Sequence, residues 1–257
     1  FGDLLNKGTM GNQGLHMKKP NILFLFTDDQ RFDTIGVLNN PAIKTPVLDY
    51  LVSKGTCFTN AYIMGGSCDA VCMPSRAMLH TGRNLYSLEG SGESIPAGHT
   101  MMGETFNQAG YATYGIGKWH NGTSAFNRSF SNGAEIFFGG MDDHWNVPAC
   151  NYDPTGVYPL PKPYRRDNGF DPVTMHDVVF DHVSAGRHST DIFADAAVDF
   201  LNNYRDESSP FYLYVSFMAP HDPRTMPMKY RTMYDPEKIE LPASFSPEHP
   251  FDNGALD

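Results

Sequence analysis

The segment CMPSRAMLHTG, residues 72–82, places a cysteine, a proline and an arginine at spacings that can build a reactive site. Pro74 is typical of the first turn of a helix, and Gly82 is typical of the residue that follows its end. A lone Cys-x-Pro would indicate a buried cysteine in front of such a helix. Arg76 makes the pattern harder to dismiss, because ordinary residue usage produces this spacing in very roughly one chain in a hundred. We therefore treat Cys72 and Arg76 as candidate site residues.

A second segment, GYATYGIGKWH at residues 110–120, ends in a lysine and a histidine two positions apart. Taken singly, Lys118 would be a solvated side chain and His120 a satisfied core residue. Residues two apart at the end of a strand project to the same side, so the pair indicates a shared site.

Three polar clusters each follow a short apolar segment that predicts a buried strand. They are Asp28-Asp29 after residues 21–27, Lys118 and His120 after residues 111–117, and His221 after residues 211–217. In open α/β sheets, ligands bind outside the carboxyl ends of the strands. The three clusters therefore predict one pocket.

Helices are expected between these strands, at residues 46–54, 74–81, 100–110 and 189–206. Strands that alternate with helices predict an α/β fold with a largely parallel central sheet and helices on both faces. Residues 139–188 hold six prolines and show little periodicity, so we expect a long irregular loop there.

Composition narrows the class of protein. The chain has 257 residues, with 19 basic and 29 acidic side chains and a net charge of −10, which disfavours a general nucleic-acid binder. No apolar run is long enough for a membrane-spanning helix. An anionic small substrate remains compatible with this charge if its pocket is locally positive. The spacings of the four cysteines fit no zinc template and leave the disulfide status of Cys57, Cys68 and Cys150 open.

The two signature segments together resemble those of the formylglycine sulfatases, members of the alkaline phosphatase superfamily. Asp28-Asp29 and His221 are similar to other landmarks in the N-terminal part of that family, and APHDPRTMPMKYR resembles bacterial members that act on sulfated carbohydrates. The resemblance spans residues 20–257. It implies the N-terminal part of a catalytic domain whose C-terminal remainder is absent, with residues 1–19 a leader or a cloning remnant.

The resemblance also implies a chemistry. A formylglycine-generating or sulfatase-maturing enzyme would oxidise Cys72 to an aldehyde, which is hydrated to a gem-diol. One diol oxygen attacks sulfur and expels the alcohol, and the second then expels sulfate. Arg76 would hold the diol and Lys118 would contact the sulfate. His120 would act as the base toward the diol, and His221 would contact the sulfate or act as the acid toward the leaving alcohol.

Asp28 and Asp29 would bind a divalent cation, Ca²⁺ by preference and Mg²⁺ as second choice, because carboxylates without nearby thiolates suit a hard ion. His144 and Trp145, in the irregular loop, are candidates for contact with the substrate. The histidines at 176, 182 and 188 are spaced by six, which suits no zinc helix, and are expected at the surface.

Other functions stay open at this point. A phosphate or phosphonate ester hydrolase on the same fold would share these motifs, and so would a non-catalytic sulfoglycan-binding relative. The expected partners are a glycan or small-molecule sulfate ester, the maturing enzyme, and a missing C-terminal part of the same protein. That part would supply further metal ligands and a second lysine. Export to the periplasm or secretion is expected from the same resemblance.

Overall fold

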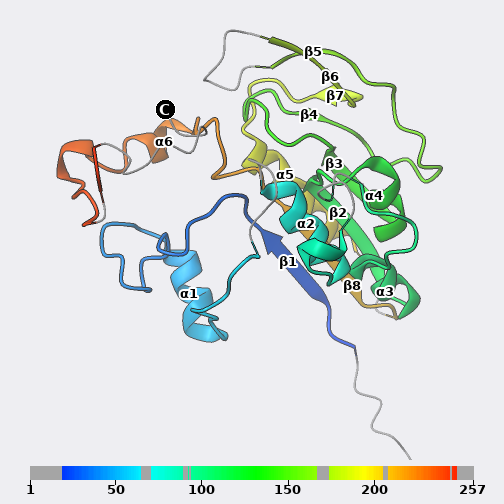
Figure 1. The fold of residues 1–257 in the computed structure, drawn as a ribbon, viewed down its shortest axis with the longest axis horizontal. Helices are drawn as coiled ribbons and strands as arrows, with labels where there is room; N and C mark the ends of the chain where they lie inside the picture. The colour runs from blue at the N-terminus through cyan, green and yellow to red at the C-terminus, as the bar shows by residue number, and fades with distance from the viewer. Residues whose placement is uncertain are drawn as a thin grey trace, which may run out of the picture.

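The protein is built around a sheet of four parallel strands in the order β1-β8-β2-β3 (Figure 1). The strands are β1 (Ile22–Phe26), β8 (Phe211–Ser216), β2 (Ala112–Lys118) and β3 (Asn132–Phe137). The computed structural model describes residues 19–64, 71–88, 92, 94–166, 174–204, 208–243 and 245–247. The predicted parallel α/β sheet is confirmed, and its three predicted strands are direct neighbours.

Alternate residues of β8 enter two separate cores. Tyr212 and Tyr214 pack with aromatic residues under α2 (Cys72–Thr81), α3 (Met102–Gln108) and α4 (Thr123–Ser129). Leu213 and Val215 pack against α5 (Ser189–Asn203) on the opposite face. Helices therefore cover both faces, as predicted, and the central strand is buried on both sides.

Strand β1 forms an edge of the described sheet. Phe24 and Phe26 pack on Tyr214, whereas Leu23 and Leu25 on the other face are 48% and 53% exposed. The predicted helix α1 (Pro46–Lys54) is present but buries no residue, and in Figure 1 it stands apart from the sheet layers.

Residues 139–188 are more ordered than expected. They contain the antiparallel pair β4 (Pro148–Ala149) and β7 (His182–Val183), and the antiparallel pair β5 (Lys162–Arg166) and β6 (Thr174–Val178). Two-stranded pairs of two to five residues leave no long hydrophobic period in the sequence. The expectation of a purely irregular loop was therefore wrong.

The remaining described elements are short. They are η1 (Leu85–Ser87), α6 (Met228–Arg231) and η3 (Pro236–Lys238). None of the described helices has the length and apolarity needed to cross a membrane. Cys57, Cys72 and Cys150 are free thiols, and Cys68 lies outside the described residues.

Candidate active site

The carboxyl ends of β1, β8 and β2 lie side by side, and backbone hydrogen bonds join the segments that follow them. The Phe217 amide donates to the Phe26 carbonyl at 2.7 Å, and the Asp28 amide donates to the Ala219 carbonyl at 3.2 Å. Lys118 is the last residue of β2. The polar clusters that the sequence places after three strands therefore meet at one edge of the sheet.

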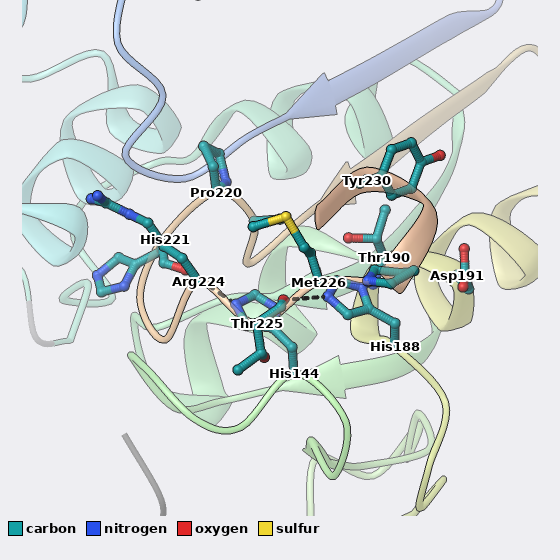
Figure 2. Close-up of a pocket in the computed structure, with 12 residues that line it drawn as sticks. His144, His188, Thr190, Asp191, Pro220, His221, Arg224, Thr225, Met226 and Tyr230 are labelled. Carbon is teal, nitrogen blue, oxygen red and sulfur yellow. Dashed lines mark hydrogen bonds between the residues drawn. The ribbon is translucent and has the colours of Figure 1, made fainter. Parts of the chain in front are cut away.

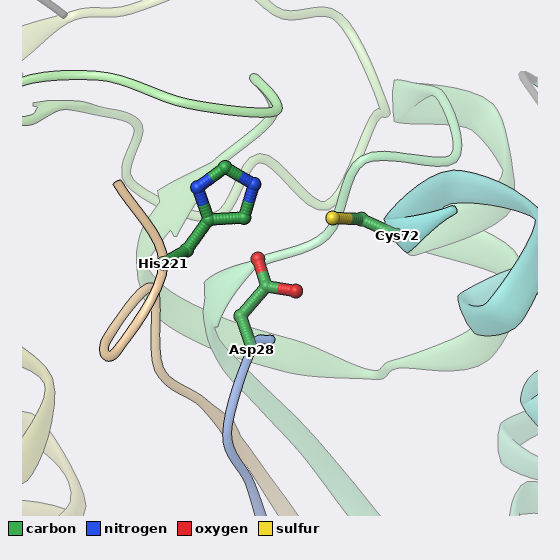
Figure 3. Close-up of side chains that lie close together, drawn as sticks. All are labelled: Asp28, Cys72 and His221. Atoms are coloured by element: carbon green, nitrogen blue, oxygen red, sulfur yellow. The ribbon is translucent and has the colours of Figure 1, made fainter. Parts of the chain in front are cut away.

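Cys72 faces this edge from the first residue of α2. Candidate ligand atoms of Asp28, Cys72 and His221 all lie within 4.8 Å of one another (Figure 3). The helix begins two residues earlier than predicted, so Cys72 stands at its N-terminus, where unpaired amides favour negative charge. At its other end Gly82 follows the helix as predicted, and it adopts a left-handed conformation with φ of 64°.

Two buried cations lie beside this group. Lys118 forms an ion pair with Asp28, and both Lys118 and Arg76 are 1% exposed. Arg76 Nη1 donates to the Lys118 carbonyl at 2.8 Å and to Ser216 Oγ at 2.6 Å, while Nη2 lies 3.5 Å from Asp28 Oδ2. One carboxylate between two cations leaves an excess of positive charge, which suits an anionic ligand.

Burial and neighbouring charges shift the pKa values of this group. Burial alone would raise the pKa of the Asp28 carboxyl, but the charges of Lys118 and Arg76 outweigh burial and hold that pKa below its ordinary value. Burial lowers the pKa of the Lys118 ammonium, and Asp28 opposes that change. Burial raises the pKa of the Cys72 thiol, so unmodified Cys72 is a protonated thiol at neutral pH and a poor nucleophile.

His120 has an unusual backbone and an available ring nitrogen. Its φ of 67° lies in the left-handed region, which is uncommon for a residue with a side chain. Burial, together with the charges of Lys118 and Arg76, lowers the pKa of its imidazole to about 3. Its buried Nδ1 has no hydrogen-bond partner among the described residues. A neutral imidazole with this pKa is a weak base, and its Nδ1 can accept a hydrogen bond from a hydroxyl.

Comparison with known proteins decides the family. Residues 20–243 match the sulfatase family. The chain belongs to the sulfatases. It is 31% identical over 241 residues to an ulvan-active sulfatase of Formosa agariphila, covering 90% of this chain and 41% of that protein. It is 29% identical over 220 residues to human N-acetylgalactosamine-6-sulfatase, covering 79% of this chain and 40% of that one.

Solved structures show the same fold. The crystal structure of Ps i-CgsB in complex with k-i-k-neocarrahexaose matches with a TM-score of 0.62 and 25% identity, over 87% of this chain and 50% of that one. A phosphonate monoester hydrolase of Agrobacterium radiobacter matches with a TM-score of 0.60 and 18% identity, over 87% of this chain and 45% of that one, and it shows the fold alone. The chain thus spans 40% to 50% of the length of these relatives.

Within this sulfatase, the two predicted metal ligands are placed differently. Asp28 is 5% exposed and lies in the group with Cys72 and His221. Asp29 has a φ of 59°, and its exposed carboxylate lies 3.7 Å from Arg224 Nη2. The buried Asp28 carboxylate suits a hard cation, whereas the Asp29 carboxylate would have to turn away from Arg224 to share it.

His144 and Trp145, the predicted substrate contacts, are largely enclosed by protein. His144 is 1% exposed, and both of its ring nitrogens have partners, Ser189 Oγ and the His221 carbonyl. Trp145 is half-buried and packs edge-on against His188. Contact of these residues with substrate stays a prediction.

The expected surface positions of three histidines need one correction. His176 is exposed and His182 is half-buried, but His188 is 5% exposed. His188 caps α5 through its side chain, which accepts a hydrogen bond from the Thr190 amide. Histidine spacing carries no signal for the burial of His188, because that burial depends on contacts with His144 and Trp145, which lie far away in the sequence.

Sequence reasoning missed several residues that hold the sulfatase site together. Ser216 anchors Arg76, and Asn121, fully buried, donates to the Met73 carbonyl at 3.0 Å and to the Gly92 carbonyl. Asn121 therefore ties the start of α2 to the end of β2. Its position directly after His120 was the one available signal.

Proposed function

We propose that this sulfatase hydrolyses sulfate esters of a sulfated carbohydrate, using a formylglycine made from Cys72. The observation that carries the proposal is the buried pair Arg76 and Lys118 beside Cys72, which stands at a helix N-terminus. A sulfate ester is an anion, and its transition state spreads negative charge over the sulfate oxygens and the leaving group. Positive groups fixed in advance are the largest expected source of rate enhancement.

Formylglycine at position 72 would supply the attacking oxygen as a hydrated aldehyde. Arg76 is held by Ser216 and by the Lys118 carbonyl, so it would orient that group without moving during the reaction. Lys118 would neutralise the sulfate. Burial and the charges of Lys118 and Arg76 lower the pKa of His120 to about 3, and the negative charge of a bound sulfate would raise it again. His120 would then accept a proton through Nδ1 from a hydroxyl at position 72. His221 would give a proton to the leaving alcohol.

Asp28 would hold a divalent cation, with Ca²⁺ preferred over Mg²⁺, and Asp29 would join it after leaving Arg224. The cation would supply further positive charge next to the sulfate. With Asp28 holding the cation, Lys118 would exchange its ion pair with Asp28 for contact with the sulfate.

Support for a carbohydrate substrate comes from the relatives, which include an ulvan-active sulfatase and an N-acetylgalactosamine-6-sulfatase. The likeness to a phosphonate monoester hydrolase makes phosphoryl or phosphonyl transfer the competing activity. A sulfate monoester carries one negative charge and a phosphate monoester carries close to two. The net charge of the site must match the charge of the ester that it binds, so it affects the preference between the two esters.

Two measurements test the proposal in protein purified from its native host. Mass spectrometry of the peptide that contains residue 72 should show a mass about 18 Da below that of the cysteine form, as sulfur and two hydrogens are lost and oxygen is gained. The enzyme should hydrolyse the sulfate monoester of an aryl alcohol faster than the phosphate monoester of the same alcohol. It should also release sulfate from sulfated oligosaccharides. Cys72→Ala should abolish turnover. Faster cleavage of the phosphate ester would overturn the proposal.

A further inference from the structure

The segment that carries His221, residues 217–227, contains no helix or strand. Two buried imidazoles reach its backbone. His144 Nε2 lies 3.1 Å from the His221 carbonyl oxygen, and His188 Nε2 lies 3.0 Å from the Thr225 carbonyl oxygen. Two side chains from other parts of the fold thus hold this loop at points four residues apart.

The partners of the two rings indicate which ring nitrogens carry hydrogen. A carbonyl oxygen only accepts, so Nε2 carries the hydrogen in both rings. Nδ1 of His188 accepts from the Thr190 amide at 3.2 Å, so His188 has its hydrogen on Nε2 alone. Nδ1 of His144 lies 2.7 Å from Ser189 Oγ, a hydroxyl that can donate to it, so His144 can adopt the same tautomer. Burial holds the pKa of His144 below its ordinary value, which agrees with this assignment.

The rings are themselves rigidly supported. His144 and His188 stack with their centroids 5.0 Å apart and their planes 5° apart, and Trp145 packs edge-on against His188. The Ser189 amide donates to the His144 carbonyl at 2.7 Å. The pair is thereby joined to the start of α5, whose buried residues belong to the core on that face of the sheet.

A cavity of about 290 Å³ borders the loop, with a lining that includes Met226, Tyr230 and both histidines. Figure 2 shows His221 and Arg224 extending to one side of the loop, and His188, Thr190 and Asp191 on the other side. A backbone segment beside a cavity gains little from packing on that side. Backbone hydrogen bonds at Phe217 and Ala219 hold the start of the loop to β1 and the residues that follow it, and the two imidazole hydrogen bonds anchor the next part of the loop, at His221 and Thr225.

We propose that His144 and His188 are positioning residues that hold the His221 loop in the geometry the reaction needs. The role rests on the proposed function, since it assigns His221 to the reaction. A displacement of about 1 Å in a reacting group costs about 100-fold in rate. Loss of either anchor should therefore slow the chemical step more than it weakens substrate binding.

Paired substitutions in the complete natural protein distinguish the hydrogen bond at Nδ1 of each ring from the hydrogen bond at Nε2. Asparagine reaches about as far as Nδ1, and glutamine reaches about as far as Nε2. His188→Asn should keep the helix cap and lose the loop anchor, so kcat should fall at least 10-fold with little change in KM. His188→Gln should keep the anchor and lose the cap, so Tm should fall while kcat stays within about 3-fold of the wild type.

The same comparison applies to His144. His144→Gln should retain kcat, whereas His144→Asn and the size-matched His144→Leu should both lower it at least 10-fold. His182→Asn, at a half-buried histidine outside the site, is the matched control, expected to alter stability and leave kcat unchanged. Equal kcat values for the asparagine and glutamine variants at both positions would show that the rings act only by filling space, and would overturn the proposal.

A second readout does not depend on turnover. Hydrogen exchange of peptides covering residues 217–227, measured without substrate, should be faster in His144→Asn than in His144→Gln and the wild type. A wild-type protein without sulfatase activity would refute the proposed function but leave this measurement valid. Equal exchange in all variants would refute the positioning role even in an active enzyme.

Discussion

Gly140 sets the position of His120. A Cβ atom on Gly140 would lie 2.5 Å from His120 Cε1 and 2.6 Å from Nε2, closer than real Cβ contacts allow. His120 already has a left-handed backbone, so its ring has little freedom to give way. The absence of a side chain at position 140 is thus what allows the imidazole its present place.

Gly140→Ala should displace this ring and lower kcat by about 10-fold to 100-fold, since catalytic groups tolerate little misplacement. Steady-state kinetics with an aryl sulfate would measure the effect. Gly98→Ala is the matched control, because no atom lies within 4 Å of a Cβ there and φ is ordinary. Equal kcat in the two variants would show that the ring adjusts freely.

Arg224 lies where it would compete with a bound cation for Asp29. Its guanidinium also lies 3.1 Å from Asp222, so it bridges the exposed Asp29 carboxylate and the half-buried Asp222 carboxylate. Arg224→Gln should tighten Ca²⁺ binding about 3-fold, because a nearby positive charge is removed and screening at the surface keeps the effect small. Asp29→Asn should weaken binding. Calorimetric titration of Ca²⁺ in the complete protein would measure both, and unchanged affinity in Asp29→Asn would remove Asp29 from the metal site.

At the scale of elements, strands followed by polar residues were predictable. The apolar segments around β1, β2 and β8 gave correct strands, and the sites at their carboxyl ends followed from the geometry of parallel sheets. The helix at 72–81 was predictable from Pro74 and Gly82, with an error of two residues at its start.

Other elements had no local signal. Strand β3 carries a bulge at which the register with β2 shifts, and Glu135 is its extra residue, with a φ of 50°. A bulge redirects a side chain in a way that hydrophobic alternation does not encode. The burial of His188 and the anchoring of Arg76 by Ser216 depend on contacts between segments far apart in the sequence, and these could not be predicted from periodicity.

The bulge has a structural role that can be tested. Glu135 Oε2 lies 3.0 Å from His182 Nε2, and Asp181 contacts His182 Nδ1, so one imidazole joins β3 to β7 between two carboxylates. Burial alone would lower the pKa of His182, but hydrogen bonds and charges from Asp181 and Glu135 outweigh burial and raise it.

A raised pKa in the folded state means that the charged histidine stabilises the protein at low pH. This contribution is complete below the unfolded value of about 6.5 and is lost as pH rises through the folded pKa. His182→Asn should therefore lower the free energy of unfolding by about 1 kcal/mol at pH 5.5 and by less at pH 8.5. Urea unfolding at the two pH values would measure the difference. An equal loss of unfolding free energy at both pH values would refute a stabilising charge on His182.

At the scale of the molecule, an acidic protein concentrates positive charge in one place. The chain has a net charge of −10, yet the buried ionic group at the sheet edge contains two cations and one carboxylate. Both cores contribute to this arrangement, because β8 is buried on both faces and ends at Ser216, the partner of Arg76. Site and cores should therefore be lost together on unfolding.

Acid should destabilise the whole molecule through a histidine in the core. His80 on α2 is 1% exposed and packs 4.5 Å from the Trp119 ring and 5.1 Å from the Tyr214 ring. Burial, and then the charge of Arg76, lower the pKa of His80 from 6.5 to about 3. Between these values the unfolded chain binds a proton that the folded protein excludes, so stability falls as pH falls.

His80→Leu removes this difference while keeping an apolar side chain at the position. The variant should gain about 2 kcal/mol more relative to the wild type at pH 5 than at pH 7.5, since each pH unit below 6.5 corresponds to about 1.4 kcal/mol. Urea unfolding of both proteins at the two pH values would measure it. If the two proteins differed by the same free energy of unfolding at both pH values, His80 would take up a proton as readily in the folded protein as in the unfolded chain. Its contacts with Trp119 and Tyr214 and its nearness to Arg76 disfavour that outcome.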